Sequence, residues 1–209
     1  MKLKTTLLFF FLSAPLFGNT MTYQSSLNRF SPTERASSHG VGVNLGSGFE
    51  QIRTPEEDGS ISTQTVTRAW LTKGIFWPLD IGLGLASFEE EKSYSGYIQY
   101  TLYEKFMTPA IALRTTHSRM FVSTQGPLHT TTAQILASWG YRSISLWANF
   151  GYAHHIQVSD TNDYHQWGEL TQDAGFYWHL FPPFIAVSAE VKTAQTSPKS
   201  YAFKVSIGI

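Results

Sequence analysis

The chain has 209 residues, with 15 basic residues against 15 acidic ones, and 15% of its residues are aromatic while 14% are charged. The charge balance argues against a nucleic-acid-binding surface, and the absence of cysteine excludes a disulfide framework and a thiol nucleophile. Soluble domains usually contain about a quarter charged residues, so few charges and many aromatics favour a chain that meets lipid.

The N-terminus has the order of a secretory signal peptide, in which positive charges precede a short apolar run and small residues. We expect a signal peptide over residues 1–18, a polar N-terminal arm over 19–38 and a barrel domain over 39–209. Loss of two lysines with the signal leaves the mature chain with two more acidic than basic residues. No later run approaches the roughly 18 apolar residues that a membrane helix needs. The features of the signal are Lys2, Lys4, Leu7–Leu12, Ser13, Ala14 and Gly18.

The first predicted strand is His39–Gln51, because apolar residues such as Leu45 alternate with glycines such as Gly46. Glycines that face a barrel interior leave room for large side chains opposite them. The polar stretch Thr54–Ser60 is predicted to be a solvent loop. The next strands are predicted at Ser62–Gly74, Ile81–Ala86 and Tyr94–Tyr103, separated by the aromatic turn Phe76–Asp80 and the charged hairpin Glu89–Lys92.

The second half of the chain continues the alternation. A long loop is predicted at His117–His129, and Arg142–Ser143 is a two-residue hairpin connection. The strands are predicted at Ala110–Thr116, Thr130–Tyr141, Ile144–His155, Glu169–Leu180, Ile185–Lys192 and Tyr201–Ile209, and the other connections at Phe106–Pro109, Ser159–Gln166, Phe181–Pro183 and Ala194–Lys199.

The last strand, Tyr201–Ile209, alternates large apolar residues with small or polar ones and needs a partner strand. About ten strands, each near the length that a tilted strand needs to cross the hydrocarbon, allow the first strand to be that partner. The connections after odd-numbered strands are polar and mostly long, and those after even-numbered strands are short. The sequence therefore predicts an all-β fold: a closed, antiparallel, up-and-down transmembrane β-barrel of about ten strands.

Aromatic residues gather near both ends of the predicted strands, which indicates two girdles at the membrane interfaces. Those near the short turns are Trp77, Phe106, Tyr141, Trp178, Phe181 and Phe184, and those near the outer ends are Phe49, Phe88, Tyr94, Tyr152 and Tyr201.

With its signal, its strand pattern and its closing strand, the chain from about His39 to Ile209 resembles the small outer-membrane β-barrel proteins of Gram-negative bacteria. The resemblance implies a porin-like barrel in the cell outer membrane, surrounded by outer-membrane lipid and inserted by the barrel-assembly machinery. Members of that class usually end in an aromatic residue that this machinery reads, whereas this chain ends in Ile209.

Charged residues at inward positions are predicted to form a network in the lumen, because buried charges are normally paired. Glu190 and Lys204, on neighbouring strands, are the first pair expected. The alternative is that these residues line a thin polar pore. The inward charges are Glu50, Arg68, Arg114, Asp173, Glu190 and Lys204.

The loop after the seventh strand holds the residues nearest to a hydrolytic site. Omptin proteases, which are ten-stranded barrels, use an Asp pair and an Asp-His pair at the rim, but the spacing here does not match theirs. Smaller lipid A deacylases use His and Ser, which Ser159 beside the histidines could mimic. Adjacent His154 and His155 point to opposite faces of a strand and cannot share one metal without a bulge. The candidate residues are His154, His155, His165, Asp160 and Asp163.

The sequence has no Gly-rich phosphate loop, no zinc spacing and no nucleophile elbow, so we predict no catalytic residue, metal or cofactor. The leading hypothesis is a non-enzymatic outer-membrane barrel with a structural or interaction role, or a narrow pore. The alternatives are a rim hydrolase acting on lipid A or peptide, and a soluble periplasmic β-barrel or sandwich that binds a ligand, whose apolar faces would point inward.

Overall fold

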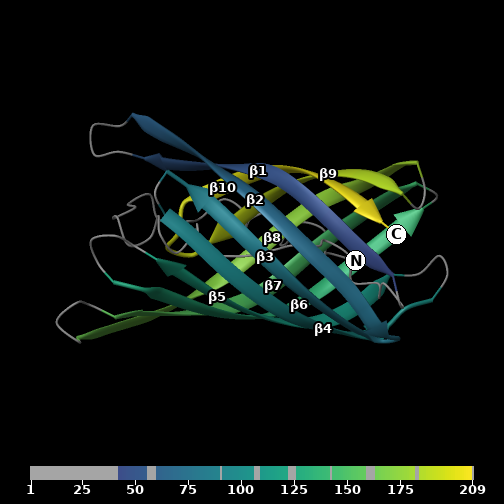
Figure 1. Ribbon diagram of the computed structural model, residues 1–209, viewed down its shortest axis with the longest axis horizontal. Coiled ribbons are helices and arrows are strands. Elements are labelled where there is room, and N and C mark those ends of the chain that lie inside the picture. Colours follow the sequence, from purple (N-terminus) through teal and green to yellow (C-terminus); the bar gives the residue numbers. More distant parts are fainter. Residues whose placement is uncertain are drawn as a thin grey trace, which may run out of the picture.

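The computed structural model describes residues 42–55, 60–89, 91–105, 109–121, 126–141, 143–158, 163–181 and 184–208. The predicted signal peptide and N-terminal arm lie outside these residues. Ten antiparallel strands, each hydrogen-bonded to its neighbours in the chain, form a closed barrel (Figure 1). The predicted fold class and strand number are therefore confirmed. No helix in the described ranges is long and apolar enough to cross a membrane.

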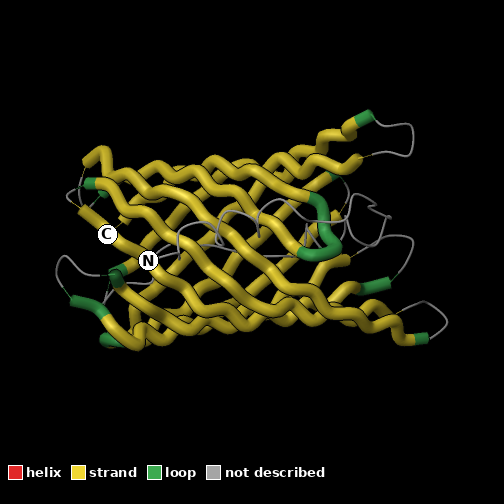
Figure 2. Tube along the Cα trace, turned by 180° about the vertical axis from the view of Figure 1, so that it is seen from behind, coloured by secondary structure: helices red, strands yellow, loops and turns green. Residues whose placement is uncertain are grey.

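The strands are long and are tilted relative to the barrel axis (Figure 2). In chain order they are β1 (Val43–Pro55), β2 (Ile61–Phe76), β3 (Leu79–Phe88), β4 (Glu91–Tyr103), β5 (Ala110–Phe121), β6 (Leu128–Tyr141), β7 (Ile144–Val158), β8 (Tyr164–Phe181), β9 (Ile185–Ala194) and β10 (Lys199–Gly208).

The barrel closes where the first strand meets the last. Strand β1 pairs with β10 from Asn44 opposite Gly208 to Arg53 opposite Lys199, and its other edge pairs with β2. All sheet edges are thereby satisfied, as a membrane environment requires. The expected pairing of the first strand with the closing strand is confirmed.

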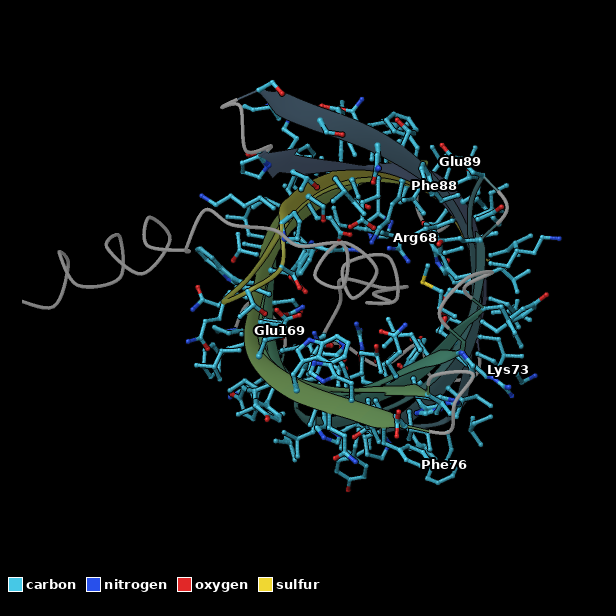
Figure 3. All side chains as sticks on the ribbon, turned by 90° about the vertical axis from the view of Figure 1, so that its left-hand side faces the viewer. Arg68, Lys73, Phe76, Phe88, Glu89 and Glu169 are labelled. Atoms are coloured by element: carbon cyan, nitrogen blue, oxygen red, sulfur yellow. The ribbon has the colours of Figure 1, made fainter. Side chains whose placement is uncertain are left out.

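Alternate side chains point into lipid and into the lumen. Strand β5 alternates strictly between buried and exposed residues along its whole length, and the outward Leu83 of β3 is 66% exposed. In the end-on view of Figure 3, Arg68 and Glu169 point into the barrel while Lys73 and Phe76 point out of it. An apolar outer wall around a polar interior is the arrangement of a membrane barrel. It excludes the soluble alternative, in which the apolar faces would point inward.

Two of the expected loops are shorter in the structure. Strand β5 continues to Phe121 and β6 begins at Leu128, so the bounds predicted for the loop at His117–His129 were too wide; β8 likewise begins at Tyr164, within the loop predicted at Ser159–Gln166. The alternation of burial carries on through polar residues, with Ser118 inside and Arg119 outside. Above the lipid an outward residue need not be apolar, so apolar periodicity underestimates strand length there.

The connections after odd-numbered strands were predicted to be longer than those after even-numbered strands, and this holds only in part. The connection from β3 to β4 spans just residues 89–90, whereas that from β4 to β5 spans 104–109. On the outer side, length also comes from the strands, because the β7–β8 hairpin reaches furthest to the left in Figure 1.

Exposed aromatic rings lie near both ends of the barrel wall. Trp77, Trp178 and Phe184 are exposed at the short-turn end, and Phe49, Tyr94, Tyr152 and Tyr201 are exposed on the outer halves of their strands. Phe88 was wrongly assigned to the outer girdle, since it packs against buried residues of the lumen. Phe106 and the side chains of Tyr141 and Phe181 lie outside the described part of the chain.

Candidate functional site

A chain of buried charges lies in the lumen where the barrel closes. The Glu50 carboxylate of β1 is fully buried and accepts hydrogen bonds from Arg68 Nε of β2, at 2.5 Å, and from Lys192 Nζ of β9, at 3.0 Å. The Ser200 hydroxyl of β10 donates a further hydrogen bond to its other oxygen. The Glu50 carboxylate thus links side chains of four strands, β1, β2, β9 and β10, through hydrogen bonds.

The chain of charges continues through a second carboxylate. Lys192 Nζ lies 3.1 Å from Glu190 Oε1, and Lys204 Nζ of β10 lies 2.7 Å from the same oxygen. The contact expected between Glu190 and Lys204 is therefore present. The ion pairs follow one another in the order Arg68, Glu50, Lys192, Glu190, Lys204. Sequence reasoning left Lys192 out of the network, although it shares the inward parity of Glu190 on β9.

Large aromatic rings pack beside these charges because the facing residues are glycines. Lys204 Nζ lies 5.6 Å from the centre of the Trp70 ring, which adds a cation–π contact. A Cβ atom built on Gly46, the register partner of Trp70, would lie 2.2 Å from that ring. One built on Gly82 would lie 2.0 Å from the ring of its partner, Tyr97. The room that inward glycines leave is thus occupied by the rings opposite.

Arg114 and Asp173, the other two predicted members of the network, have separate surroundings. Arg114 Nη2 and Nε donate to Gln99 Oε1 at 2.6 and 3.1 Å, and the guanidinium lies 5.1 Å from the centre of the Tyr97 ring. Asp173 Oδ2 accepts a hydrogen bond from Asn149 Nδ2 at 3.0 Å. Both side chains are buried, as their parity predicts.

An apolar cluster lies on the loop side of the charges, because it includes Ile52, two residues beyond Glu50 toward the loop end of β1. It joins side chains from six strands. Sequence analysis did not identify it, since its members sit singly among polar residues and only the closed barrel brings them together. We call it the apolar layer; its members are Ile52, Val66, Ala86, Met120 and Leu128, with Phe88 and Trp167 packed against them.

His155 is the one candidate histidine that makes a buried polar relay in the described residues. Its Nδ1 lies 2.9 Å from Thr130 Oγ1 and its Nε2 lies 3.1 Å from Glu169 Oε1. Glu169 also accepts hydrogen bonds from the hydroxyls of Thr196 and Ser197, both at 2.7 Å. Hydroxyl, imidazole and carboxylate follow the order of a nucleophilic triad, but all three are at most 1% exposed, which leaves no access for a substrate.

The other predicted rim residues do not converge with His155. His154 has outward parity on β7, and the His165 ring lies 5.3 Å from the Trp167 ring, which in turn stacks on His155 at 4.9 Å. Asp163 is exposed, and Asp160 and Ser159 lie outside the described residues. Within the described ranges, no three His, Asp or Glu side chains gather as a set of metal ligands.

Neither a protein-family model nor a curated protein matches the chain. Solved structures with a similar architecture include the N-terminal β-barrel domain of Pseudomonas aeruginosa OprF, at 12% identity and a TM-score of 0.44 over 81% of this chain and 98% of that one. The outer membrane protease OmpT of Escherichia coli matches at 9% identity and a TM-score of 0.42, over 87% of this chain and 98% of that one. The outer membrane protein OprG of Pseudomonas aeruginosa matches at 9% identity and a TM-score of 0.41, over 84% of this chain and 99% of that one.

At such low identities and scores, the fold rests on the hydrogen-bonded strand order and the apolar outer wall of this chain itself. On those observations, the chain is a membrane-spanning β-barrel of the outer-membrane type.

Proposed function

We propose that this protein resides in the bacterial outer membrane as a structural or interaction protein whose lumen is closed by its own side chains. The observation that carries the proposal is the continuous chain of ion pairs from Arg68 to Lys204 across the strands where the barrel closes.

The burial of these charges favours a plug over a pore. An ion-conducting lumen keeps its charged side chains hydrated and available to the passing ion. Here the side chains of Glu50 and Glu190 have no exposed surface, and those of Arg68, Lys192 and Lys204 are at most 2% exposed. Buried charges in this setting need direct partners, and each carboxylate has two cations within ion-pair distance.

The apolar layer adds a second barrier on the loop side of the charges. Hydrophobic constrictions resist wetting, so ions crossing this level would lose their hydration without gaining polar contacts. The charges and the apolar layer would together keep the barrel closed while the hairpins on the outer side face the surroundings.

Single-channel recording in planar bilayers tests the closed lumen. We expect the wild-type protein to show no steady conductance and a Glu50→Ala, Glu190→Ala double variant to conduct, because its three cations would repel one another and draw in water. Leu113→Ala, an outward substitution on β5, is the matched control and should behave as the wild type does. A steady wild-type conductance would overturn the closed-lumen proposal.

The rim hydrolase is a second candidate, favoured by the relay of Thr130, His155 and Glu169 alone. Activity on lipid A or peptide that is abolished in the His154→Ala, His155→Ala, His165→Ala triple variant would support it. Unchanged activity in that variant would remove it. Because the relay is buried, the proposal of a non-enzymatic barrel takes precedence.

A further inference from the structure

Four basic side chains gather on the outward face of β4, β5 and β6 at its outer end. We call them the basic patch: Lys92, His117, Arg119 and His129. The strand register brings them together, because Arg119 is the partner of His129. Lys92 is the partner of Phe121, two residues along β5 from Arg119.

The contacts of the basic patch are with aromatic rings and a hydroxyl. The His117 and His129 rings lie 5.8 Å apart, and the Arg119 guanidinium lies 4.7 Å from the centre of the Phe121 ring. His117 Nδ1 lies 3.0 Å from Thr131 Oγ1. In the part of the chain that the structure describes, no carboxylate forms an ion pair with Lys92 or Arg119. Lys92 and Arg119 carry the positive charge of the patch, and a pair of cations of this kind is complementary to an anion.

The position of the patch places that anion at the membrane interface. The Phe121 ring packs edge to face on Tyr94 at 6.0 Å, and Tyr94 belongs to the outer aromatic girdle. Such girdles mark the level of lipid headgroups. The positive charges therefore lie at the depth where the phosphates of the outer leaflet are found.

An apolar groove runs along the outer wall below the patch. It has a volume of about 580 Å³, and His117 lines it as well as the patch. Gly96 of β4, the register partner of His117, lies in the groove wall with no side chain to fill it. The other lining residues are Leu71, Lys73, Ile81, Gly82, Leu83, Tyr97, Ile98 and Thr115.

We propose that the basic patch and this groove form one binding site for a phosphorylated lipid of the outer leaflet. The phosphate is held by Arg119 and Lys92 with the two histidines beside it, and an acyl chain lies in the groove over Gly96. The inference rests on the membrane location within the proposed function, but it does not depend on whether the lumen is closed.

The combination of features selects this occupant over other anions. Inorganic phosphate would gain nothing from an apolar groove, and a soluble partner could not reach a groove that lies at the depth of the hydrocarbon. A lipid with a phosphorylated headgroup matches both the charge of the patch and the apolar wall below it.

The test uses the full-length mature protein, purified in mild detergent, with bisphosphorylated lipid A as the probe and retained lipid counted by native mass spectrometry. We expect the Lys92→Gln, Arg119→Gln variant to bind at least about tenfold more weakly, because it loses both charged hydrogen-bond donors to the phosphate. The matched control is Arg53→Gln, Lys199→Gln, a register pair of cations on the outward face of β1 and β10. It should change affinity less than about twofold.

A second variant tests the groove without touching the charges. A Cβ on Gly96 would meet its nearest neighbours, Gly82 O and Leu83 Cδ2, at 3.7 Å, which is ordinary contact, so Gly96→Leu should fold and fill the groove. We expect it to weaken lipid A binding while Ala133→Leu, an outward substitution on β6, leaves it unchanged.

Three outcomes would overturn the inference: equal retention of lipid A and of its fully dephosphorylated form, equal losses in the Arg119 and Arg53 double variants, or full displacement of the lipid by millimolar inorganic phosphate. Channel recordings on the same preparations keep the two proposals distinct, since a conducting wild-type barrel that still binds lipid A would overturn only the closed lumen.

Discussion

The lumen at the barrel closure and the outer wall over β4–β6 both contain lysine and arginine side chains, but the two regions differ in what surrounds these charges. In the lumen, Arg68, Lys192 and Lys204 share two buried carboxylates at 2.5–3.1 Å. On the wall, Arg119 lies over the Phe121 ring, and Lys92 is the register partner of Phe121. A buried cation without a direct polar partner is very costly, whereas a cation at the interface can draw its counter-charge from lipid.

The largest expected effect comes from removing the Glu50 carboxylate, which Arg68 and Lys192 share. Glu50→Leu leaves Arg68 and Lys192 without it, and breaking a buried pair in this way costs about 3–5 kcal/mol. The loss of unfolding free energy can be measured by urea denaturation in detergent micelles. Lys199→Gln, on the outward face of β10, is the matched control and should lie within about 0.5 kcal/mol of the wild type. A Glu50→Leu protein as stable as the wild type would show that the ion pairs do not hold the closure together.

An intermediate effect is expected at the glycine that faces Trp70. Gly46→Val would place atoms within the space of that ring, and overpacking of this kind costs about 1–3 kcal/mol. Trp70→Leu should restore much of the stability in the double variant, because it vacates the same space. The measurement is again urea denaturation, and additive losses in the double variant would contradict the packing argument.

The smallest effect is expected on the wall. Arg119→Gln should alter the unfolding free energy by less than about 0.5 kcal/mol in micelles without phosphorylated lipid, since no described carboxylate is lost as a partner. Adding lipid A should stabilise the wild type and leave the variant nearly unchanged, which thermal unfolding can record. A large loss for Arg119→Gln in lipid-free micelles would show that the outer cations are structural after all.

Alternation along each strand was enough to predict the direction of the main lumen residues. Glu50, Arg68 and Lys204 were assigned inward from their parity alone, and they are buried. Glu190 and Lys204 could be paired because their strands are consecutive. The aromatic girdle was less predictable, since Phe88 lies near the end of its strand, where packing in the lumen rather than lipid determines the position of the ring.

The sequence by itself determined the strand number, the two faces of each strand and the closed antiparallel class, because the period of two is a local property of the extended backbone. Only the tertiary structure decided which inward residues meet. Glu50 and Lys192 are 142 positions apart, and the relay from Thr130 to Glu169 and the apolar layer likewise join residues from different strands. Those contacts depend on strand register and on closure, which bring distant residues to the same level of the lumen and leave no local pattern in the chain.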